Sequence, residues 1–358
     1  MDYAVPLAAA LQSHAFHLLS TLLLFLLTYI NLPGEATWRR LTAFVASCLY
    51  IVSPAGLFLS APYSESTFAF FNFLGMICVS RLRPRSGSLP DTYRQTVSTI
   101  LSGLFFAIAC MIRGNGILSL LVYIEPGLIL LNELLAGPLR LPAFVKLVGV
   151  GLAGLLGLSG FVLPQFLAYR KYCQSDVRRP WCDNFIPSIY SFVQEHYWNV
   201  GFLRYWTLSN VPLFLMALPM LAILLLTGLV CLTGRPTLAK FRPSPSSQSN
   251  ELVIQQVPFP QALRRMALPQ VALAVLAFTN FHVQIINRLS SGYPLWYVVL
   301  AIAITTTEGN EGERRSKTSE IPGTTYLSNK RTQKWIVRSM IMYAMIQGGL
   351  FASFLPPA

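Results

Sequence analysis

The stretch SPAGLFLSAPYSES at residues 53–66 places one glutamate, Glu65, in a strongly apolar part of the chain. A carboxylate at the centre of a membrane helix costs roughly 2.5–3.5 kcal/mol on insertion scales, so such a residue usually faces a cavity or has a functional role. Pro54 and Pro62 favour a broken or re-entrant turn, which a membrane tolerates only where protein or water satisfies the freed backbone groups. The stretch predicts a polar site cut into a membrane protein.

The composition of the chain indicates a membrane-spanning protein. Hydrophobic residues make up 54% of the 358 residues, charged residues only 11%, and the mean hydropathy is +0.53. Because a spanning helix needs about 20 mostly apolar residues, we predict an all-α polytopic protein with about 9–10 transmembrane helices. We expect one multi-span domain over residues 1–358. The candidate spans are 5–30, 41–60, 64–80, 96–112, 116–135, 143–168, 210–233, 267–287, 294–306 and 335–355.

Two of these spans have alternative interpretations. Segment 294–306 is short and could be re-entrant, while 41–60 and 64–80 could form one hairpin with Pro62 near its tip. These alternatives stay open at the level of the sequence.

The net charge of +13 would suggest a nucleic-acid partner in a soluble protein. Membrane topology explains it better here. If the spans alternate and loop 81–94 is cytoplasmic, most of the 27 basic residues lie on the cytoplasmic side, as the positive-inside rule predicts. Loops 234–266 and 307–334 then are cytoplasmic connectors, to which we assign no chemistry. We expect no nucleic-acid partner, and both chain ends on the non-cytoplasmic side.

Four polar segments gather on the non-cytoplasmic side: 60–66, 112–116, 169–209 and 279–294. The long lumenal loop 169–209 is dense in Trp, Tyr and Phe, which is typical of an interfacial segment. The aromatic residues suit a membrane-interface belt, a lid over an acceptor groove, or both. The same loop contains Cys173 and Cys182, candidates for a disulfide if that side is oxidising, although spacing does not establish the geometry.

The polar residues on this side suit phosphate chemistry without a metal. The histidines do not cluster with carboxylates at ligand spacing, and no P-loop or GxGxxG motif is present. Arginine binds phosphate bidentately, and a carboxylate can accept the proton of an attacking hydroxyl. We therefore take Glu65 as the candidate catalytic residue. The candidate substrate-binding residues are Tyr63, Ser64, Arg113, Asn115, Gln194, Tyr197, Trp198, Arg204, His282, Gln284 and Arg288.

Each arginine has a simpler interpretation as well. A long basic side chain at the end of a membrane helix often extends to the interface without any role in a site. This alternative stays open for Arg113, Arg204 and Arg288.

Several stretches follow the order of motifs in a known family. They are SPAGLFLSAPYSES at 53–66, MIRGNGIL at 111–118, PSIYSFVQEHYWNVGFLRYW at 187–206 and HVQIINRLSSGYPLWY at 282–297. Together they resemble the GPI mannosyltransferase 2 family. The resemblance implies a GT-C-like glycosyltransferase of the endoplasmic reticulum membrane that adds the second mannose, in α-1,6 linkage, to the GPI lipid precursor on the lumenal face. It also implies dolichyl-phosphate mannose as the donor, no further cofactor, and a small membrane partner subunit in fungi.

One departure from the family concerns the catalytic acid. Members usually carry an earlier membrane segment and a lumenal loop with a Trp-Asp motif whose aspartate is thought to be catalytic. Asp2 is not in such a motif, so we expect a chain without that N-terminal segment. Glu65, in the SAPYSES motif, is the remaining acid, as base, substrate ligand or structural residue. An inactive short form is one alternative, and a non-enzymatic transporter or scaffold subunit is another; transport would favour internal repeats, and none is evident.

Overall fold

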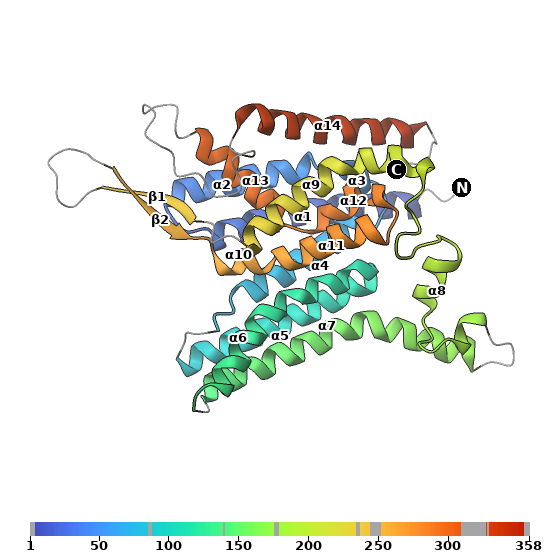
Figure 1. The fold of residues 1–358 in the computed structure, drawn as a ribbon, viewed down its shortest axis with the longest axis horizontal. Helices are drawn as coiled ribbons and strands as arrows, with labels where there is room; N and C mark the ends of the chain where they lie inside the picture. The colour runs from blue at the N-terminus through green and yellow to red at the C-terminus, as the bar shows by residue number, and fades with distance from the viewer. Residues whose placement is uncertain are drawn as a thin grey trace.

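The computed structural model describes residues 4–84, 88–138, 140–174, 179–233, 237–243, 252–308, 327 and 329–353. These residues form a helical bundle with one two-stranded ribbon (Figure 1). Among them, seven helices are long and apolar enough to cross a membrane, or up to eight if the bent pair 283–292 and 295–306 is one span. The predicted all-α polytopic class is confirmed.

The N-terminal helices are α1 (Ala4–Asn31), α2 (Ala36–Ile51), the short α3 (Gly56–Ser60) and α4 (Glu65–Ser80). The expected span 41–60 is therefore broken. The residue before a proline disfavours the helical conformation, and the chain turns at Ser53, whose Oγ accepts hydrogen bonds from the Ala55 backbone N–H at 3.3 Å and from the Tyr297 hydroxyl at 2.9 Å. α2 and α4 have 16 residues each, shorter than a typical span of about 20 residues.

A second group of helices contains α5 (Leu89–Ile112), η1 (Gly114–Tyr123), α6 (Ile124–Leu135) and α7 (Leu141–Cys173). It forms the lower part of Figure 1. α5 and α7 approach closely because small residues face each other: a Cβ on Gly160 would lie 2.1 Å from the Ala107 carbonyl oxygen, and one on Gly103 would lie 2.4 Å from that of Ala153. Such contacts are typical of membrane helix pairs.

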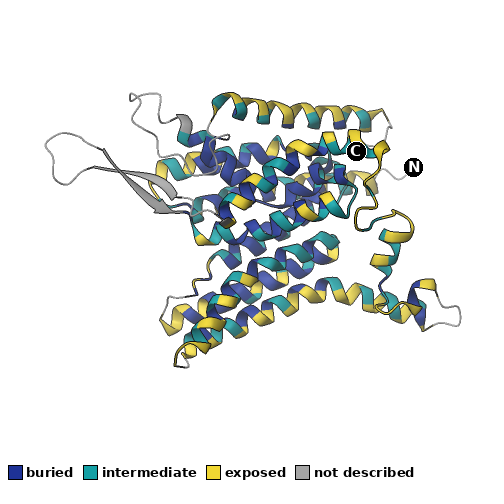
Figure 2. Cartoon of the chain, viewed as in Figure 1, coloured by how far each residue is buried: buried dark blue, intermediate teal, exposed yellow. Residues whose placement is uncertain are grey.

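The C-terminal half contains α9 (Val211–Thr233), α10 (Gln261–Arg265), α11 (Ala267–Thr279), α13 (Leu295–Glu308) and α14 (Lys330–Ala352). The expected span 267–287 is broken, because α11 ends at Thr279. Three short helical segments follow it: η4 (Val283–Ile285), α12 (Ile286–Leu289) and η5 (Ser290–Gly292). Together they meet α13 at a 76° bend. α13 lies at the centre, in contact with α2, α9 and α14, and its Trp296 and Tyr297 are fully buried. Figure 2 shows this buried centre.

The two ends of the bundle differ in their connecting segments. At one end, β1 (Thr237–Pro243) and β2 (Leu252–Pro258) pair antiparallel, so part of the expected connector 234–266 has regular structure. Most of the expected connector 307–334 lies outside the described residues. At the opposite end lie η2 (Pro180–Asp183), α8 (Ile189–His196) and η3 (Leu208–Asn210), and Cys173 and Cys182 form a disulfide there.

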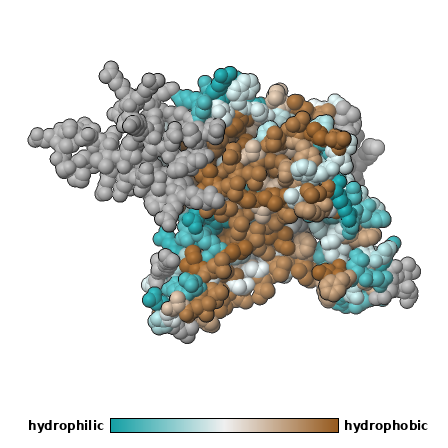
Figure 3. All heavy atoms as spheres, viewed as in Figure 1, coloured by the Kyte–Doolittle hydropathy of each residue, from teal (hydrophilic) through white to brown (hydrophobic). Residues whose placement is uncertain are grey.

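The surface of the bundle agrees with a position across a membrane. A broad hydrophobic band covers the visible face in Figure 3, and hydrophilic residues gather toward its left and right ends. α1 begins and α14 ends at the right-hand end of Figure 1, where α8 also lies. We call this the α8 end of the bundle, and the opposite one the ribbon end.

Candidate functional site

The buried carboxylate of Glu65 joins three segments that are far apart in the sequence. Glu65 is the first residue of α4, and its side chain is 2% exposed. Its Oε1 forms an ion pair with the Arg113 Nη1 at 2.5 Å and a second one with the Arg288 Nε. Arg113 directly follows α5 and Arg288 belongs to α12. Both arginine side chains keep some exposure, 16% and 27%, so neither is fully buried.

Further contacts fix the orientation of each guanidinium. Arg113 donates from Nη1 to the Ser64 hydroxyl at 3.2 Å and from Nε to the Asn115 side-chain oxygen at 3.4 Å. The Arg288 guanidinium lies over the rings of Phe58 and Tyr63, 4.6 and 5.2 Å from their centroids, an arrangement that the ring quadrupole favours. The arginines are therefore held in place before any ligand arrives.

These arginines line a cavity of about 470 Å³ at the α8 end of the bundle. Its wall takes residues from each of the four polar segments that the sequence predicts on one side. The lining residues are Ser64, Ile112, Arg113, Gly114, Asn115, Tyr190, Gln194, Trp198, Val200, Phe281, His282, Ile285, Arg288 and Leu289. The expected convergence of these segments is thus confirmed.

Helix α8 forms one wall of this cavity. Ser188 caps the helix by accepting from the Ser191 backbone N–H at 3.2 Å. Gln165 of α7 anchors the same turn, since its Oε1 accepts from the Ser188 hydroxyl at 3.1 Å and from the Tyr190 backbone N–H at 3.0 Å. The Tyr190 ring then fits against Gly114, where a Cβ would lie 2.8 Å from its hydroxyl oxygen. Burial raises the pKa of Tyr190, so its hydroxyl is a neutral donor at physiological pH.

The segment after α8 is held on the end of α11 by backbone contacts. The Leu203 backbone N–H donates to the Thr279 carbonyl at 2.7 Å, and Leu203 adopts a φ of +56°, which is uncommon for a residue other than glycine. His282 contacts the Trp198 carbonyl at 2.7 Å and stacks on the Tyr205 ring, with centroids 4.6 Å apart. These contacts place Trp198 and His282 together on the cavity wall.

The structure separates the predicted substrate-binding residues into two sets. Ser64, Arg113, Asn115, Gln194, Trp198, His282 and Arg288 line the cavity. Tyr63, Tyr197, Arg204 and Gln284 do not.

The four residues outside the lining have other contacts or face solvent. Tyr63 packs on Arg288, and Gln284 accepts from the Tyr205 hydroxyl at 3.0 Å. Tyr197 is 70% exposed, and Arg204 pairs with Glu195 at 2.8 Å on the surface. For Arg204, the simpler interpretation as a surface arginine fits these contacts.

The sequence-based selection missed two tyrosines. Tyr190 lines the cavity, and the Tyr293 hydroxyl donates to the Asn115 carbonyl at 2.9 Å and supports the 112–116 segment. Tyr190 shares the helical spacing of the aromatic residues in 187–197, a signal that could have selected it. Tyr293 follows a glycine after the Ser-Ser pair, and nothing in that pattern indicates its contact.

The electrostatics of the cavity suit an anion. Two arginines share one carboxylate, and no acidic side chain occurs among the described residues that line the cavity. Glu65 itself does not line it, and its second oxygen, Oε2, is buried without a hydrogen-bond partner among the described residues. These contacts favour a positioning role for Glu65, whereas its role as a catalytic base stays a prediction. Paired guanidinium groups with an excess positive charge can hold a phosphate.

Comparisons with known proteins place the chain in a family. The sequence profile described as mannosyltransferase (PIG-V) matches residues 2–358. A protein named GPI mannosyltransferase 2 from Chaetomium globosum is 40% identical over 99% of this chain and 71% of its own length. Proteins of the same name are 37% identical in Aspergillus oryzae, over 98% of this chain and 74% of theirs, and 38% identical in Gibberella zeae, over the same shares. No solved structure matches the chain.

These matches agree with the family resemblance of the motifs at 53–66, 111–118, 187–206 and 282–297. Each of the four motifs contributes residues that line the cavity or support its wall. The profile covers nearly the whole chain, and the relatives are matched over more than two thirds of their length. The chain therefore belongs to the mannosyltransferase (PIG-V) family.

Proposed function

We propose that this chain is a mannosyltransferase of GPI-anchor biosynthesis that moves mannose from dolichyl-phosphate mannose to the GPI lipid precursor. The observation that carries the proposal is the pair of arginines, Arg113 and Arg288, held by one buried carboxylate at the wall of a cavity whose described lining residues include no acid. A lipid-linked sugar phosphate supplies the anion that this arrangement suits. The names of the relatives supply mannose as the sugar and GPI as the acceptor class.

The chemistry of the transfer explains why a positive pocket is useful. The acceptor hydroxyl oxygen attacks C1 of the mannose, and the bond from C1 to the phosphate oxygen breaks with its electron pair on the phosphate. The donor phosphodiester carries one negative charge, and the released phosphate monoester carries up to two. Arginines fixed around that phosphate therefore stabilise the leaving group more strongly than the substrate, which lowers the barrier.

The described cavity lining offers no carboxylate to accept the hydroxyl proton, so the proton passes to the phosphate monoester that leaves C1. Glu65 already carries two ion pairs through one oxygen. We therefore assign Glu65 the positioning of Arg113 and Arg288, and we assign the base to none of the described lining residues.

Charge supports a lumenal position for the cavity. Among the described residues, most basic ones belong to segments at the ribbon end, and under the positive-inside rule such a bias favours a cytoplasmic ribbon end. The endoplasmic reticulum, the α-1,6 linkage and a small membrane subunit rest on the family resemblance. None of these three is needed for the phosphate-binding role of the arginines.

Transfer assays on membranes that contain the chain test the proposal. Arg113→Gln and Arg288→Gln should each reduce kcat/KM for dolichyl-phosphate mannose by about 100-fold, the usual effect of removing one donor to a developing negative charge. Arg113→Lys keeps the charge but not the forked geometry, so its loss should be intermediate. The matched control is Arg170→Gln, an exposed arginine at the same end of the bundle, which should transfer mannose as the wild type does. Wild-type kinetics in both cavity variants would overturn the assignment.

A further inference from the structure

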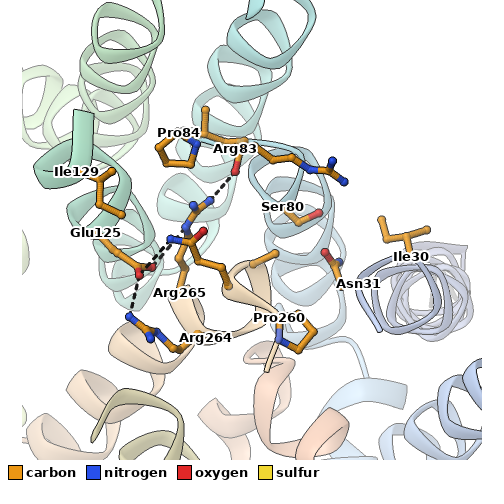
Figure 4. A pocket seen from close by; sticks show the side chains of 13 residues that line it. Ile30, Asn31, Ser80, Arg83, Pro84, Glu125, Ile129, Pro260, Arg264 and Arg265 are labelled. Carbon is orange, nitrogen blue, oxygen red and sulfur yellow. Dashed lines mark hydrogen bonds and ion pairs between the residues drawn. The ribbon is translucent and has the colours of Figure 1, made fainter. Parts of the chain in front are cut away.

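A second cavity lies at the ribbon end of the bundle. It has a volume of about 570 Å³ and lies between the end of α1, the end of α4, α6 and α10 (Figure 4). Ile30 and Ile129 contribute apolar side chains from opposite sides of the cavity, whereas Arg83, Glu125, Arg264 and Arg265 provide charge. None of these residues belongs to the cavity at the α8 end, so this is a separate site.

The charges in this cavity do not balance. Glu125 is the single acid among its described lining residues, and it pairs with Arg264 at 3.0 Å and with Arg265 at 3.4 Å. Arg83 is the third arginine in the lining, and its guanidinium has no ion-pair or hydrogen-bond partner among the described residues. In Figure 4 its side chain points away from Glu125. The lining therefore carries an excess of two positive charges.

Arg265 shows that this excess is built into the fold. Its side chain is 2% exposed, and its Nη1 donates to the Leu82 carbonyl at 2.8 Å. Its Nη2 is buried and has no hydrogen-bond acceptor among the described residues. Burying an arginine with an unsatisfied donor costs free energy, so an anion in the cavity would stabilise the arrangement.

A neighbouring hollow extends the positive region. A cavity of about 360 Å³ is lined by Arg81, Arg83, Asp91, Arg94 and Gln95. Arg83 lines both cavities, so they adjoin. Asp91 is the single acid among the lining residues here, and it accepts from the Gln95 amide at 2.8 Å. The two cavities together hold five arginines and two acids.

The position of the larger cavity favours a lipid headgroup as the anion that it binds. The larger one lies where α1 ends at Asn31, where α4 ends at Ser80 and where α10 leads into α11. The ends of spanning helices lie at the depth of lipid headgroups. Basic pockets between helices on the cytoplasmic side bind anionic headgroups, and the Ile30 and Ile129 side chains offer apolar contacts for the adjoining acyl chain.

We propose that the cavity lined by Arg83, Arg264 and Arg265 binds the phosphate of an anionic phospholipid of the cytoplasmic leaflet. Arg83 and Arg264 line the cavity and supply positive charge for the phosphate, and Arg265 adds a buried positive charge. The site is distinct from the transfer cavity, and the proposal stands whether or not the assigned reaction is correct.

Thermal unfolding of the purified full chain in detergent tests the proposal. Short-chain phosphatidylserine should raise the Tm of the wild type, and phosphatidylcholine of the same chain length should not. The double variant Arg83→Gln/Arg264→Gln should need at least about tenfold more phosphatidylserine for the same rise in Tm. The stabilisation depends on the ratio of the lipid concentration to its Kd, and the variant should have a higher Kd. The matched control, Arg40→Gln, changes an exposed arginine at the same end of the bundle and should respond as the wild type.

Two results would overturn the proposal. An unchanged response of the double variant would place the lipid elsewhere. Inorganic phosphate could also raise the Tm of the wild type, and not of the double variant, as much as phosphatidylserine does at the same concentration. That result would mean that the cavity binds a free anion and not a lipid. The Arg83 guanidinium makes no hydrogen bond or ion pair with the other described residues, so the single variant Arg83→Gln should fold. It can replace the double variant in the test if the double variant does not fold. Its rise in Tm with phosphatidylserine should lie between those of the wild type and the double variant.

Discussion

Glu65 forms an ion pair with Arg288, which lies 223 positions further along the chain. This pair fixes the start of α4 against α12, and Arg113 adds the end of α5 to the same carboxylate. A single buried acid therefore sets the distance between two arginines that come from separate parts of the sequence. The geometry of the proposed phosphate site depends on this one carboxylate.

Replacing Glu65 with Gln should destabilise the fold and abolish transfer together. The substitution leaves two neighbouring guanidinium groups without their counter-charge, and breaking a buried ion pair in this way typically costs about 3–5 kcal/mol. Thermal unfolding and a transfer assay on the same preparation measure both effects. If Glu65 were instead the catalytic base, a folded Glu65→Gln variant would lose kcat with an unchanged Tm.

The double variant Glu65→Gln/Arg288→Gln separates the two roles further. It removes one charge of each sign, so its Tm should be higher than that of Glu65→Gln alone, whereas its transfer activity should stay low. A coupling of about 0.5–3 kcal/mol is expected for residues in one ion-pair network. Additive losses in the double variant would show that the pair is not energetically coupled.

Gly114→Ala should weaken substrate binding without unfolding the chain. An added Cβ would lie 2.8 Å from the Tyr190 hydroxyl, so the tyrosine must move away from the cavity wall. KM for the donor should rise more than kcat falls, since the change moves a wall residue and leaves Arg113 and Arg288 in place. Gly127→Ala, whose Cβ would meet Val150 at an ordinary 3.7 Å, is the matched control and should leave KM unchanged. An unchanged KM in Gly114→Ala would exclude a contact between Tyr190 and the substrate.

The sequence predicted the convergence of the polar segments better than it predicted the individual helices. Alternating spans bring every second loop to one end of a bundle, so the placement of Glu65, Arg113 and Arg288 at one end follows from span order. Hydropathy does not show where a helix ends. The expected span 267–287 is mostly apolar, yet α11 ends at Thr279, where the backbone forms hydrogen bonds with the 198–203 segment.

The position of the wall residues depended on contacts that no local pattern encodes. Tyr190 reaches the cavity because Gln165 of α7 anchors the start of α8, and the spacing between positions 165 and 190 carries no periodic signal. The net charge at the cavity wall also depends on the tertiary fold. The sequence predicts basic residues at the cavity, but only the structure shows that Arg113 and Arg288 share the single carboxylate of Glu65.

Removing the disulfide should loosen the α8 wall. Cys173 ends α7 and Cys182 lies in η2, and both are buried with Trp181 in a small separate hydrophobic cluster. Loss of a disulfide typically costs about 2–4 kcal/mol, and here the cost falls on the segment that leads into α8. Cys173→Ser should therefore raise KM for the donor and increase proteolysis within 174–188, with Cys48→Ser in α2 as the control. Equal protease resistance in both variants would show that the bond does not hold the loop.

Gly160→Val should separate α5 from α7 and displace Arg113. The new Cβ would meet the Ala107 carbonyl oxygen at 2.1 Å, and because that atom belongs to the backbone, the clash can be relieved only by moving a helix. Overpacking of this kind costs typically about 1–3 kcal/mol. Ala107 lies in the last turns of α5, and Arg113 directly follows that helix, so the movement also lengthens the contact with Glu65. Transfer should fall and the Tm should drop by several degrees.

The control for this last variant lies on the same helix. A Cβ on Gly151 would have no atom within 4 Å, and Gly151 is exposed on the outer face of α7. Gly151→Val adds the same β-branched side chain at the same kind of position, so both variants carry the same helix-propensity cost. The difference in Tm and in transfer between them measures the α5–α7 contact itself. Equal losses in the two variants would mean that the close approach at Gly160 contributes nothing to the placement of Arg113.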